Sequence, residues 1–437
     1  MRVIIVGGGI AGTSCAFFLR KFNKEAEIFL IDRESRKSYS PCALPYILSG
    51  DIERHGIFFF DDNHYRSLRI KWFPKTEVKA INTKERTVLL SGKKTLSYDY
   101  LVLATGSRAK IIENLLPLKT FEDYEGIAKN LKSRVKVSIV GAGFIGTETA
   151  ACLAKKGHRV SLIEAEERVL KNYFDAQMSN LVQEHLLKIG IKLYLKSRIK
   201  EAGKNHLKVE TERREISIGH DLAICCTGFE PETELAKKAG LRTGKGIVVD
   251  RKMRTSDPYI YACGDCVEYY DFLTKRKELT MLGSLAVRQA EVVAKNISGI
   301  GEEMKENINV FSSKVGEKFV GSAGLTKGQA AKIGIETFSA FYTGALYPEY
   351  YSDKKISYLL VSDAEGRILG AQVFSDENIY GILNCLSLAI EKGVKAKELA
   401  SLTTPYHPLC SDIIDPLTIC AGMLERKRAF HSERSSL

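Results

Sequence analysis

The sequence predicts an α/β protein with two three-layer units, each built around a parallel sheet, followed by a C-terminal α+β region. Two observations support this prediction. An apolar β-branched run, a glycine-rich turn and a helical stretch occur in that order at the N-terminus, and the same order returns from residue 136. Between residues 308 and 421 no such turn occurs, and strand-like runs alternate with an amphipathic helix. A chain of 437 residues is also too long for one core.

The first unit begins with the apolar run 3–6, which is typical of a buried parallel strand. In the turn that follows, Gly7 permits a tight bend, Gly9 lets the backbone approach a pyrophosphate, and Gly12 lets the helix pack closely on the strand. Asp32 ends the next strand, about 20 residues further on, where an acid can bind a ribose. The pattern predicts a Rossmann-like dinucleotide-binding domain.

The second unit repeats this pattern in full. The run 136–140 leads into Gly141, Gly143 and Gly146, a helix follows, and the next strand ends on Glu164. The three glycines have the spacing of their counterparts in the first unit, and an acid again ends the next strand, so the sequence predicts two bound dinucleotides rather than one.

Three further segments resemble motifs of the FAD/NAD-linked disulfide oxidoreductase superfamily. Segments 99–106 and 224–231 resemble its strand-end motifs, and 255–265 resembles its second FAD motif, in which the aspartate, here Asp265, binds a ribityl hydroxyl. The resemblance implies FAD on the first unit and NAD(P)H on the second. It assigns FAD to Gly7, Gly9, Gly12, Asp32, Thr105, Gly106, Gly264 and Asp265, and NAD(P)H to Gly141, Gly143, Gly146, Glu164 and Gly228.

The same resemblance implies the domain organisation. We expect a discontinuous FAD-binding domain at 1–115 and 240–305, an NAD(P)H-binding domain at 116–239, and a C-terminal α+β dimerisation domain at 306–437 that forms a homodimer. Glu164 favours NADH, because a carboxylate accepts hydrogen bonds from a 2′-hydroxyl and repels a 2′-phosphate. Arg168 lies close enough in sequence to leave NADPH possible.

Cys42 is the candidate redox residue. Many disulfide reductases of the superfamily carry two cysteines five positions apart, but position 47 is isoleucine. The segment 38–46 therefore resembles the single-cysteine branch, which contains NADH oxidases, NADH peroxidases, coenzyme A-disulfide reductases and polysulfide or persulfide reductases. If Cys42 caps a helix, with Pro45 in its first turn, the positive helix end lowers the thiol pKa. The alternative is a buried, inert thiol.

The first glycine turn bears on the electron acceptor. Oxidases and peroxidases of the family place a histidine there, whereas this chain has Ile10 and Ala11, which favours a sulfur substrate over peroxide. Arg20 and Lys21 match basic residues that bind coenzyme A phosphates in the disulfide reductases, or else form a solvated helix end. The resemblance thus implies reduction of coenzyme A disulfide, polysulfide or persulfide. NADH oxidase activity towards oxygen is the alternative, and a ferredoxin-type reductase with an idle Cys42 is a third.

The segment 404–416 resembles the family motif that enters the partner subunit's active site, and it presents Tyr406, His407 and Cys410 as candidate catalytic residues. His407 suits a general acid, because histidine exchanges protons readily near neutral pH. It suits an interface histidine equally well. Cys410 stands where the coenzyme A branch has a tyrosine. It either exchanges with substrate-loaded Cys42 across the dimer or is an ordinary interface thiol.

Composition excludes other classes. The net charge of +12 is spread along the chain without a nucleic-acid-binding motif, so we expect no nucleic acid partner. No apolar run is long enough for a membrane span, and the N-terminus lacks signal-peptide features, which predicts a cytoplasmic protein. We interpret the basic cluster at 425–428 as a solvated tail. Cys263 and Cys266 form a Cys-x-x-Cys pair inside the FAD motif, without the second pair that a zinc site needs.

Overall fold

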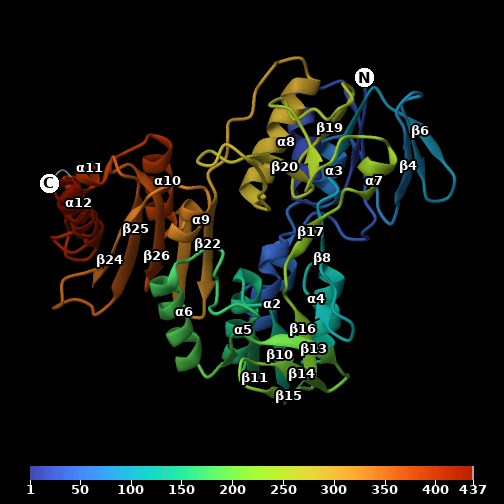
Figure 1. Cartoon of the computed structure of the whole chain (residues 1–437). Coiled ribbons are helices and arrows are strands. Elements are labelled where there is room, and N and C mark those ends of the chain that lie inside the picture. The colour runs from blue at the N-terminus through green and yellow to red at the C-terminus, as the bar shows by residue number, and fades with distance from the viewer. Residues whose placement is uncertain (132, 436–437) are drawn as a thin grey trace.

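A computed structural model describes residues 1–131 and 133–435, so the last two residues of the expected third domain lie outside it. Figure 1 shows three units, with the first at the top, the second at the bottom and the third at the left. Both N-terminal units are three-layer α/β structures, as predicted from the sequence, and the third is α+β.

The first unit contains a five-stranded parallel sheet in the order β19-β7-β1-β2-β3. Its strands are β1 (Arg2–Val6), β2 (Glu27–Ile31), β3 (Ile70–Phe73), β7 (Tyr100–Leu103) and β19 (Ile260–Ala262). The helices α1 (Ile10–Phe22) and α8 (Gly283–Ile297) pack against each other on one face. The antiparallel strands β4 (Val78–Asn82), β5 (Thr87–Leu90) and β6 (Thr95–Ser97) share a core with the sheet. Because β19 and α8 come late in the sequence, the chain leaves this unit and returns to it.

The second unit repeats the architecture with the parallel order β12-β11-β10-β16-β9. Its strands are β9 (Leu116–Pro117), β10 (Lys136–Val140), β11 (Arg159–Ile163), β12 (Lys192–Tyr194) and β16 (Leu222–Cys225). The helices α4 (Phe121–Lys129), α5 (Phe144–Lys155) and α6 (Ala176–Lys188) accompany them. A meander of β13 (Arg198–Ala202), β14 (His206–Glu210) and β15 (Glu215–Gly219) packs on the sheet through its own small core. The outgoing and returning chains pair as β8 (Ser107–Ala109) and β17 (Phe229–Pro231).

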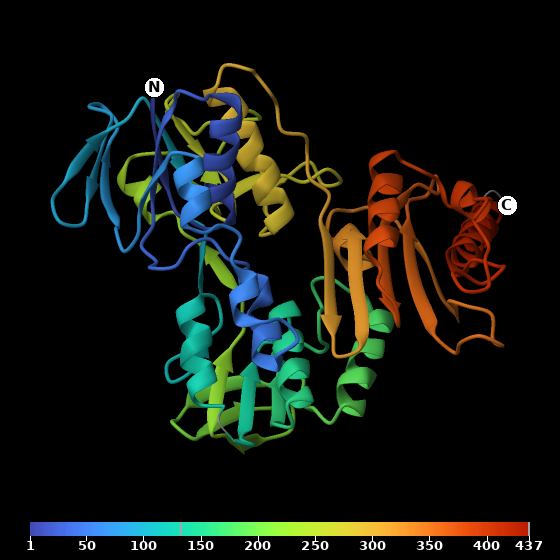
Figure 2. The ribbon, with the colours of Figure 1, turned by 180° about the vertical axis from the view of Figure 1, so that it is seen from behind.

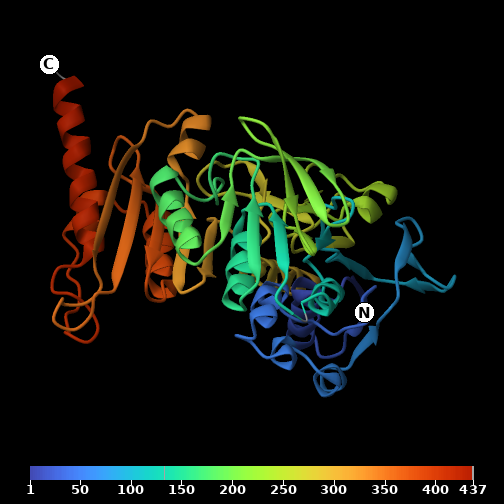
Figure 3. The same ribbon diagram turned by 90° about the horizontal axis from the view of Figure 1, so that it is seen from below.

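The third unit is an antiparallel sheet in the order β22-β23-β26-β25-β24. Its strands are β22 (Val310–Val315), β23 (Lys318–Gly324), β24 (Phe338–Ala345), β25 (Lys355–Ser362) and β26 (Ile368–Ser375). Its helices are α9 (Lys327–Lys332), α10 (Tyr380–Glu391), α11 (Ala396–Ala400) and α12 (Pro416–Ser435). The edge strand β22 packs on α5, and α12 packs on the opposite edge strand β24, as Figure 3 shows.

Shorter elements connect these units. They are the 3₁₀ turns at Pro41–Ala43 and Arg54–Ile57, the helices α2 (Leu44–Ser49), α3 (Asp62–Ser67) and α7 (Glu234–Lys238), and the strands β18 (Ile247–Val248), β20 (Val267–Tyr270) and β21 (Lys277–Leu279). The helix α2 belongs in sequence to the first unit, yet it packs against α5 of the second, and Figure 2 shows it between the two. This position brings the end of the segment that carries Cys42 to the junction of the units.

The basic cluster 425–428 is not the solvated tail that the sequence suggested. It lies within α12, where Arg428 pairs with Glu425 and donates to the Ala364 carbonyl oxygen, and Lys427 donates to the Ser339 carbonyl oxygen. The cluster therefore holds α12 against the third sheet. Within the described residues, no helix combines the length and apolar character that a membrane span requires.

Candidate active site

In the first glycine turn, the packing requires glycine at two of the three positions. Gly7 adopts φ +107°, and a Cβ there would lie 2.1 Å from the Ala104 carbonyl oxygen. A Cβ on Gly12 would lie 1.9 Å from the Gly7 carbonyl oxygen, so only glycine allows this close packing. A Cβ on Gly9, at the start of α1, would meet no protein atom within 4 Å. The open space lies where the helix N-terminus presents free N–H groups, which suits a pyrophosphate.

The second turn reproduces this arrangement. Gly141 has φ +101°, and its Cβ would lie 2.4 Å from the Cys226 carbonyl oxygen. A Cβ on Gly146 would lie 1.8 Å from the Gly141 carbonyl oxygen, while Gly143 again faces open space. The two turns therefore use two glycines for packing and leave the middle one free to approach a ligand.

A cleft of about 520 Å³ runs along the first turn. Of the residues assigned to FAD by resemblance, it is lined by Gly7, Gly9, Asp32, Thr105, Gly106, Gly264 and Asp265, whereas Gly12 lies behind it in the helix packing. Asp32 is buried at the end of β2, and this burial raises its pKa to about 6. The Thr105 hydroxyl donates to the Glu232 carbonyl oxygen at 2.7 Å, which ties the end of β7 to the returning chain.

Asp265 lies in a polar cluster that sequence reasoning did not detect. Its Oδ2 accepts hydrogen bonds from Ser107 Oγ at 2.9 Å and from Lys119 Nζ at 3.3 Å, and Lys119 also donates to Ser107 Oγ. Lys119 and Asp265 are 146 positions apart and all three residues line the cleft. No local pattern around Lys119 signals this role, because its partners come from other elements.

Glu164 directly follows β11 and lines a second, smaller pocket, which Gly143 and Arg168 also line. Its two carboxylate oxygens accept the backbone N–H groups of Ala142 (2.6 Å) and Glu166 (2.9 Å). Gly228, the remaining residue assigned to NAD(P)H, follows β16 with φ +103°.

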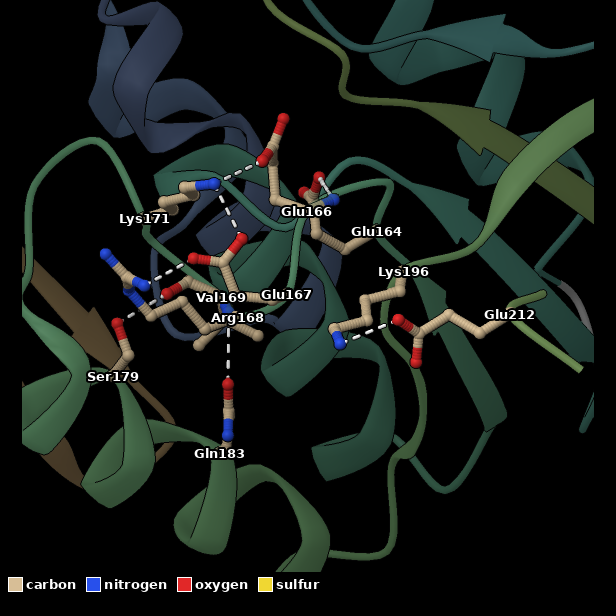
Figure 4. A network of polar contacts seen from close by, with 10 residues as sticks. All are labelled: Glu164, Glu166, Glu167, Arg168, Val169, Lys171, Ser179, Gln183, Lys196 and Glu212. Atoms are coloured by element: carbon tan, nitrogen blue, oxygen red, sulfur yellow. Dashed lines mark hydrogen bonds and ion pairs between the residues drawn. The ribbon is translucent and has the colours of Figure 1, made fainter.

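The charges beside Glu164 are largely paired with one another (Figure 4). Lys171 bridges Glu166 and Glu167 at 2.6 Å each, and Arg168 pairs with Glu167 at 2.5 Å. Both cations are thus held by carboxylates, so Arg168 does not present an unpaired charge to a 2′-phosphate.

Cys42 lies in the 3₁₀ turn Pro41–Ala43 rather than at a helix cap, and Ala43 is the N-cap of α2. The residue has solvent-accessible surface, but protein atoms crowd its sulfur. This desolvation raises the pKa of Cys42, the charge of Glu148 raises it further, and Lys119 lowers it. The expected fall in the Cys42 pKa is therefore wrong for the protein chain itself, because Cys42 does not cap a helix and desolvation raises its pKa.

The other cysteines differ in their exposure to solvent. Cys263 and Cys266 are fully buried, and this burial raises their pKa values; Cys266 Sγ donates to backbone carbonyl oxygens. Among the described residues, no cluster of three or more histidine, cysteine or acidic side chains is placed to hold a metal ion. Cys42, Cys385 and Cys410 are the exposed cysteines.

The two basic residues of α1 differ in their contacts. The Arg20 guanidinium donates to the backbone carbonyl oxygens of Leu68 and Ala26 at 2.7 and 2.8 Å, so it fastens the end of α1 to the loop before β3. Lys21 is exposed, with Nζ 5.7 Å from the centroid of the Phe22 ring. These contacts favour a structural role for Arg20 and leave Lys21 accessible.

The segment 404–416 leads into the first residue of α12 at the far edge of the third sheet. Asp412 donates its N–H to the Leu346 carbonyl oxygen, and the Tyr406 and Tyr350 hydroxyls lie 3.5 Å apart. His407 and Cys410 are exposed. Four strand spacings of about 4.8 Å separate this edge from the strand that packs on α5. The fold therefore does not bring these residues to Cys42 within one chain.

Two glycine turns at helix N-termini, each open at its middle glycine and each with an acid after the next strand, define a protein with two dinucleotide-binding sites. The chain belongs to the pyridine nucleotide-disulphide oxidoreductase family, which matches residues 1–290, and the dimerisation domain of that family matches residues 310–417. It is therefore an enzyme that uses FAD and NAD(P)H, and the fold class expected from the sequence is confirmed.

Similar proteins have different electron acceptors. An NADH oxidase from Methanocaldococcus jannaschii is 35% identical over 443 residues, covering 96% of this chain and 98% of that protein. A CoA-dependent NAD(P)H sulfur oxidoreductase from Pyrococcus furiosus is 29% identical over 440 residues, covering 97% and 99%. The solved structure of an NAD-dependent persulfide reductase from A. fulgidus has a TM-score of 0.93 at 29% identity, covering 98% of this chain and 84% of that one.

Proposed function

We propose that this enzyme reduces a sulfur substrate, either coenzyme A disulfide or a polysulfide or persulfide, through Cys42. The observation that supports this most directly is the position of Cys42. It is an exposed thiol next to Pro41, which lines the large cleft. Two charged residues of that cleft act on its pKa: Lys119 lowers it and Asp265 raises it. Bound FAD would supply electron transfer from NAD(P)H to this thiol.

The cofactor assignments are those that the family resemblance implies, because the two turns have the same geometry. We propose that FAD occupies the cleft along Gly7 to Gly12, with Asp32 at its ribose and Asp265 at its ribityl chain, and that the nicotinamide nucleotide binds at Gly141 to Gly146. The domains would then be 1–115 with 240–305, 116–239, and 306–437. Lys119 would hold Asp265 in place and offset its charge.

NADH is the preferred electron donor in this proposal. The carboxylates of Glu164 and Glu166 line the second pocket, Glu167 is adjacent in sequence, and the cations nearby already pair with Glu166 and Glu167. A 2′-phosphate would meet net negative charge there, whereas a 2′-hydroxyl can donate to Glu164.

A homodimer would complete the active site. The edge that carries the segment 404–416 exposes apolar and aromatic side chains, namely Tyr350, Tyr351, Tyr406, Leu409, Ile413 and Ile414. Such a concentration of exposed apolar surface is typical of an interface between proteins. We propose that a second copy covers this edge and brings Tyr406, His407 and Cys410 towards the Cys42 of the first.

Oxygen reduction is the second candidate function, and it is favoured by the M. jannaschii relative named NADH oxidase. Against it, Ile10 and Ala11 line the cleft where an oxidase of the family would carry a histidine. The FAD-loaded enzyme should therefore turn over coenzyme A disulfide or polysulfide faster than oxygen in parallel NADH consumption assays.

Anaerobic titration of the FAD-loaded enzyme with NADH tests the thiol step. The wild-type enzyme should take up more than the two electrons of a flavin and show a long-wavelength thiolate–flavin absorbance band. Both should be lost in Cys42→Ser, while Cys385→Ser, at another exposed thiol, serves as the control. Full sulfur-substrate turnover by Cys42→Ser would reject the proposal and favour a ferredoxin-type reductase.

A further inference from the structure

The loop that follows β11 forms most of the second pocket. Residues 164–175 run from the end of β11 to the start of α6 as turns and bends. All the residues that line this pocket belong to the loop, apart from Ala142 and Gly143 of the glycine turn. Because loops open more easily than helices and strands, the contacts of this loop with other elements determine the shape of the pocket.

The middle of the loop is held by the second unit itself. Leu170 is buried and donates its N–H to the Ala142 carbonyl oxygen at 2.9 Å. It adopts φ +54°, a conformation that a leucine takes only where its surroundings impose it. As Figure 4 shows, the Val169 N–H donates to Gln183 Oε1, and the Val169 carbonyl oxygen accepts a hydrogen bond from Ser179 Oγ. This part of the loop is therefore fixed to the glycine turn and to α6.

The end of the loop is held by the third unit. Gln372, on the central strand β26, is only 1% exposed, and its amide group forms a reciprocal pair with Asp175. Gln372 Nε2 donates to Asp175 Oδ2 at 2.7 Å, and Gln372 Oε1 accepts the Asp175 N–H at 2.8 Å. From α9, the Lys327 N–H donates to Asp175 Oδ2 at 3.1 Å, and Gln329 Nε2 donates to the Asn172 carbonyl oxygen at 3.1 Å.

Asp175 is the N-cap residue of α6, yet its side chain does not cap that helix. An aspartate at this position usually accepts a hydrogen bond from the second or third N–H of its own helix. Here the side chain accepts hydrogen bonds from Gln372 and Lys327 of the third unit instead. The helix α6 also packs on β26, and Figures 1 and 3 show it beside the third sheet. At this residue the contact between units has replaced local capping.

Aromatic rings form a second contact between the loop and the third unit. Tyr173, which lines the pocket, packs edge-on against Phe311 of β22, with ring centroids 4.6 Å apart. Both rings also lie against Phe144, the first residue of α5, at centroid distances of 4.5 and 5.9 Å. The third unit therefore contacts the pocket wall next to the helix N-terminus as well as the end of the loop.

We propose that the third unit sets the affinity of the enzyme for NADH, and that Gln372 is a positioning residue that acts through Asp175. By holding the end of the loop, Gln372 keeps the second pocket in its binding shape before the nucleotide arrives. NADH then binds without the cost of ordering the loop. The third unit would thus have a role besides dimerisation. The proposal rests on the proposed function in one respect, because it takes the second turn as the NADH site.

Gln372→Leu tests this role, because leucine occupies a similar volume without forming the two hydrogen bonds to Asp175. If the loop of this variant takes the binding shape for about a tenth of the time, the KM for NADH should rise about tenfold. The kcat at saturating NADH should stay at the wild-type value, since bound NADH orders the loop. Both values are measured on the FAD-loaded enzyme, with coenzyme A disulfide and with oxygen as the acceptor.

Substitutions at Asp175 separate positioning from general damage to the fold. Asp175→Asn keeps an oxygen that accepts from Gln372 and should retain a KM close to that of the wild type, whereas Asp175→Ala should raise the KM as Gln372→Leu does. Ser313→Ala is the matched control. It removes a 2.6 Å hydrogen bond between the same two units, from Ser313 to Glu148, and these two residues line neither the cleft nor the second pocket. Its KM for NADH should be unchanged.

Hydrogen exchange provides a readout that does not depend on turnover. The Leu170 N–H donates to Ala142 within the second unit, so its exchange reports on the position of the loop rather than on the lost pair itself. In the FAD-loaded enzyme without NADH, the peptide that contains Leu170 should exchange faster in Gln372→Leu and Asp175→Ala than in the wild type. Added NAD⁺ should restore its protection, while peptides of the third sheet keep their wild-type exchange.

A wild-type KM for NADH in both Gln372→Leu and Asp175→Ala overturns the proposal, and so does an equal rise of the KM in Ser313→Ala. If Gln372→Leu does not fold, Asp175→Ala decides, because Asp175 is only partly buried. Failure of the NADH assignment is a different result, since it appears as a wild-type KM in Gly143→Ala. A raised KM in Gly143→Ala beside a wild-type KM in Gln372→Leu and Asp175→Ala rejects the role of Gln372 alone.

Discussion

The middle glycine of each turn provides the sharpest test of how the two nucleotides are assigned. Gly9 and Gly143 have φ angles of −68° and −73°, which alanine adopts readily, and an added Cβ meets no protein atom within 4 Å. We therefore expect Gly9→Ala and Gly143→Ala to change the free energy of unfolding of the FAD-free protein by no more than about 1 kcal/mol.

Ligand binding should respond differently from folding. Each new methyl group would occupy the space where a pyrophosphate approaches the backbone, and crowding by one methyl typically costs about 1–3 kcal/mol. That cost corresponds to affinity weakened by about 5- to 150-fold. By contrast, Gly12→Ala would place its Cβ 1.9 Å from the Gly7 carbonyl oxygen and should destabilise the fold itself.

Three measurements separate these effects: thermal unfolding of the FAD-free protein, FAD affinity from flavin fluorescence, and the KM for NADH. Gly9→Ala should weaken FAD binding. Gly143→Ala should raise the KM for NADH while FAD affinity stays at the wild-type value. Wild-type FAD affinity in Gly9→Ala, or loss of FAD from Gly143→Ala, would refute the assignment of the two turns.

Three other predictions concern charge and assembly. Burial raises the pKa of Asp32 from 3.8 to about 6. The FAD-free protein should therefore lose up to about 3 kcal/mol of unfolding free energy as pH rises from 4 through 6. In urea unfolding experiments at these pH values, Asp32→Asn should remove this loss, and the same variant should bind FAD more weakly. Glu164→Gln removes a charge that repels a 2′-phosphate, so the ratio of kcat/KM for NADPH to kcat/KM for NADH should rise by about tenfold. An unchanged ratio would contradict this role of Glu164. Ile413→Glu places a charge on the exposed apolar edge and should yield monomers in sedimentation experiments, with loss of sulfur-substrate turnover; active monomers would contradict a shared active site.

The sequence alone determined the features that depend on local spacing. The continuous apolar runs predicted buried parallel strands, and the glycines at positions 7, 9 and 12 and at 141, 143 and 146 predicted two tight strand-to-helix turns. These predictions succeeded because the turn, the helix N-terminus and the strand lie within one continuous segment, so their geometry follows from backbone sterics. Asp32 and Glu164 were found in the same way, as the residues that end the next strands.

Only the tertiary structure decided which side chains from distant segments meet. Lys119 reaches Asp265 across 146 positions, and Ser313 reaches Glu148 across 165, and neither contact leaves a mark in the local pattern. The pKa of Cys42 was predicted in the wrong direction, because the local argument considered the helix end and could not include the desolvation and the Glu148 charge that the packing of α2 on α5 creates. Electrostatics and burial depend on everything nearby in space. For that reason the sequence could single out Cys42 as a candidate redox thiol, while only the fold determined its surroundings.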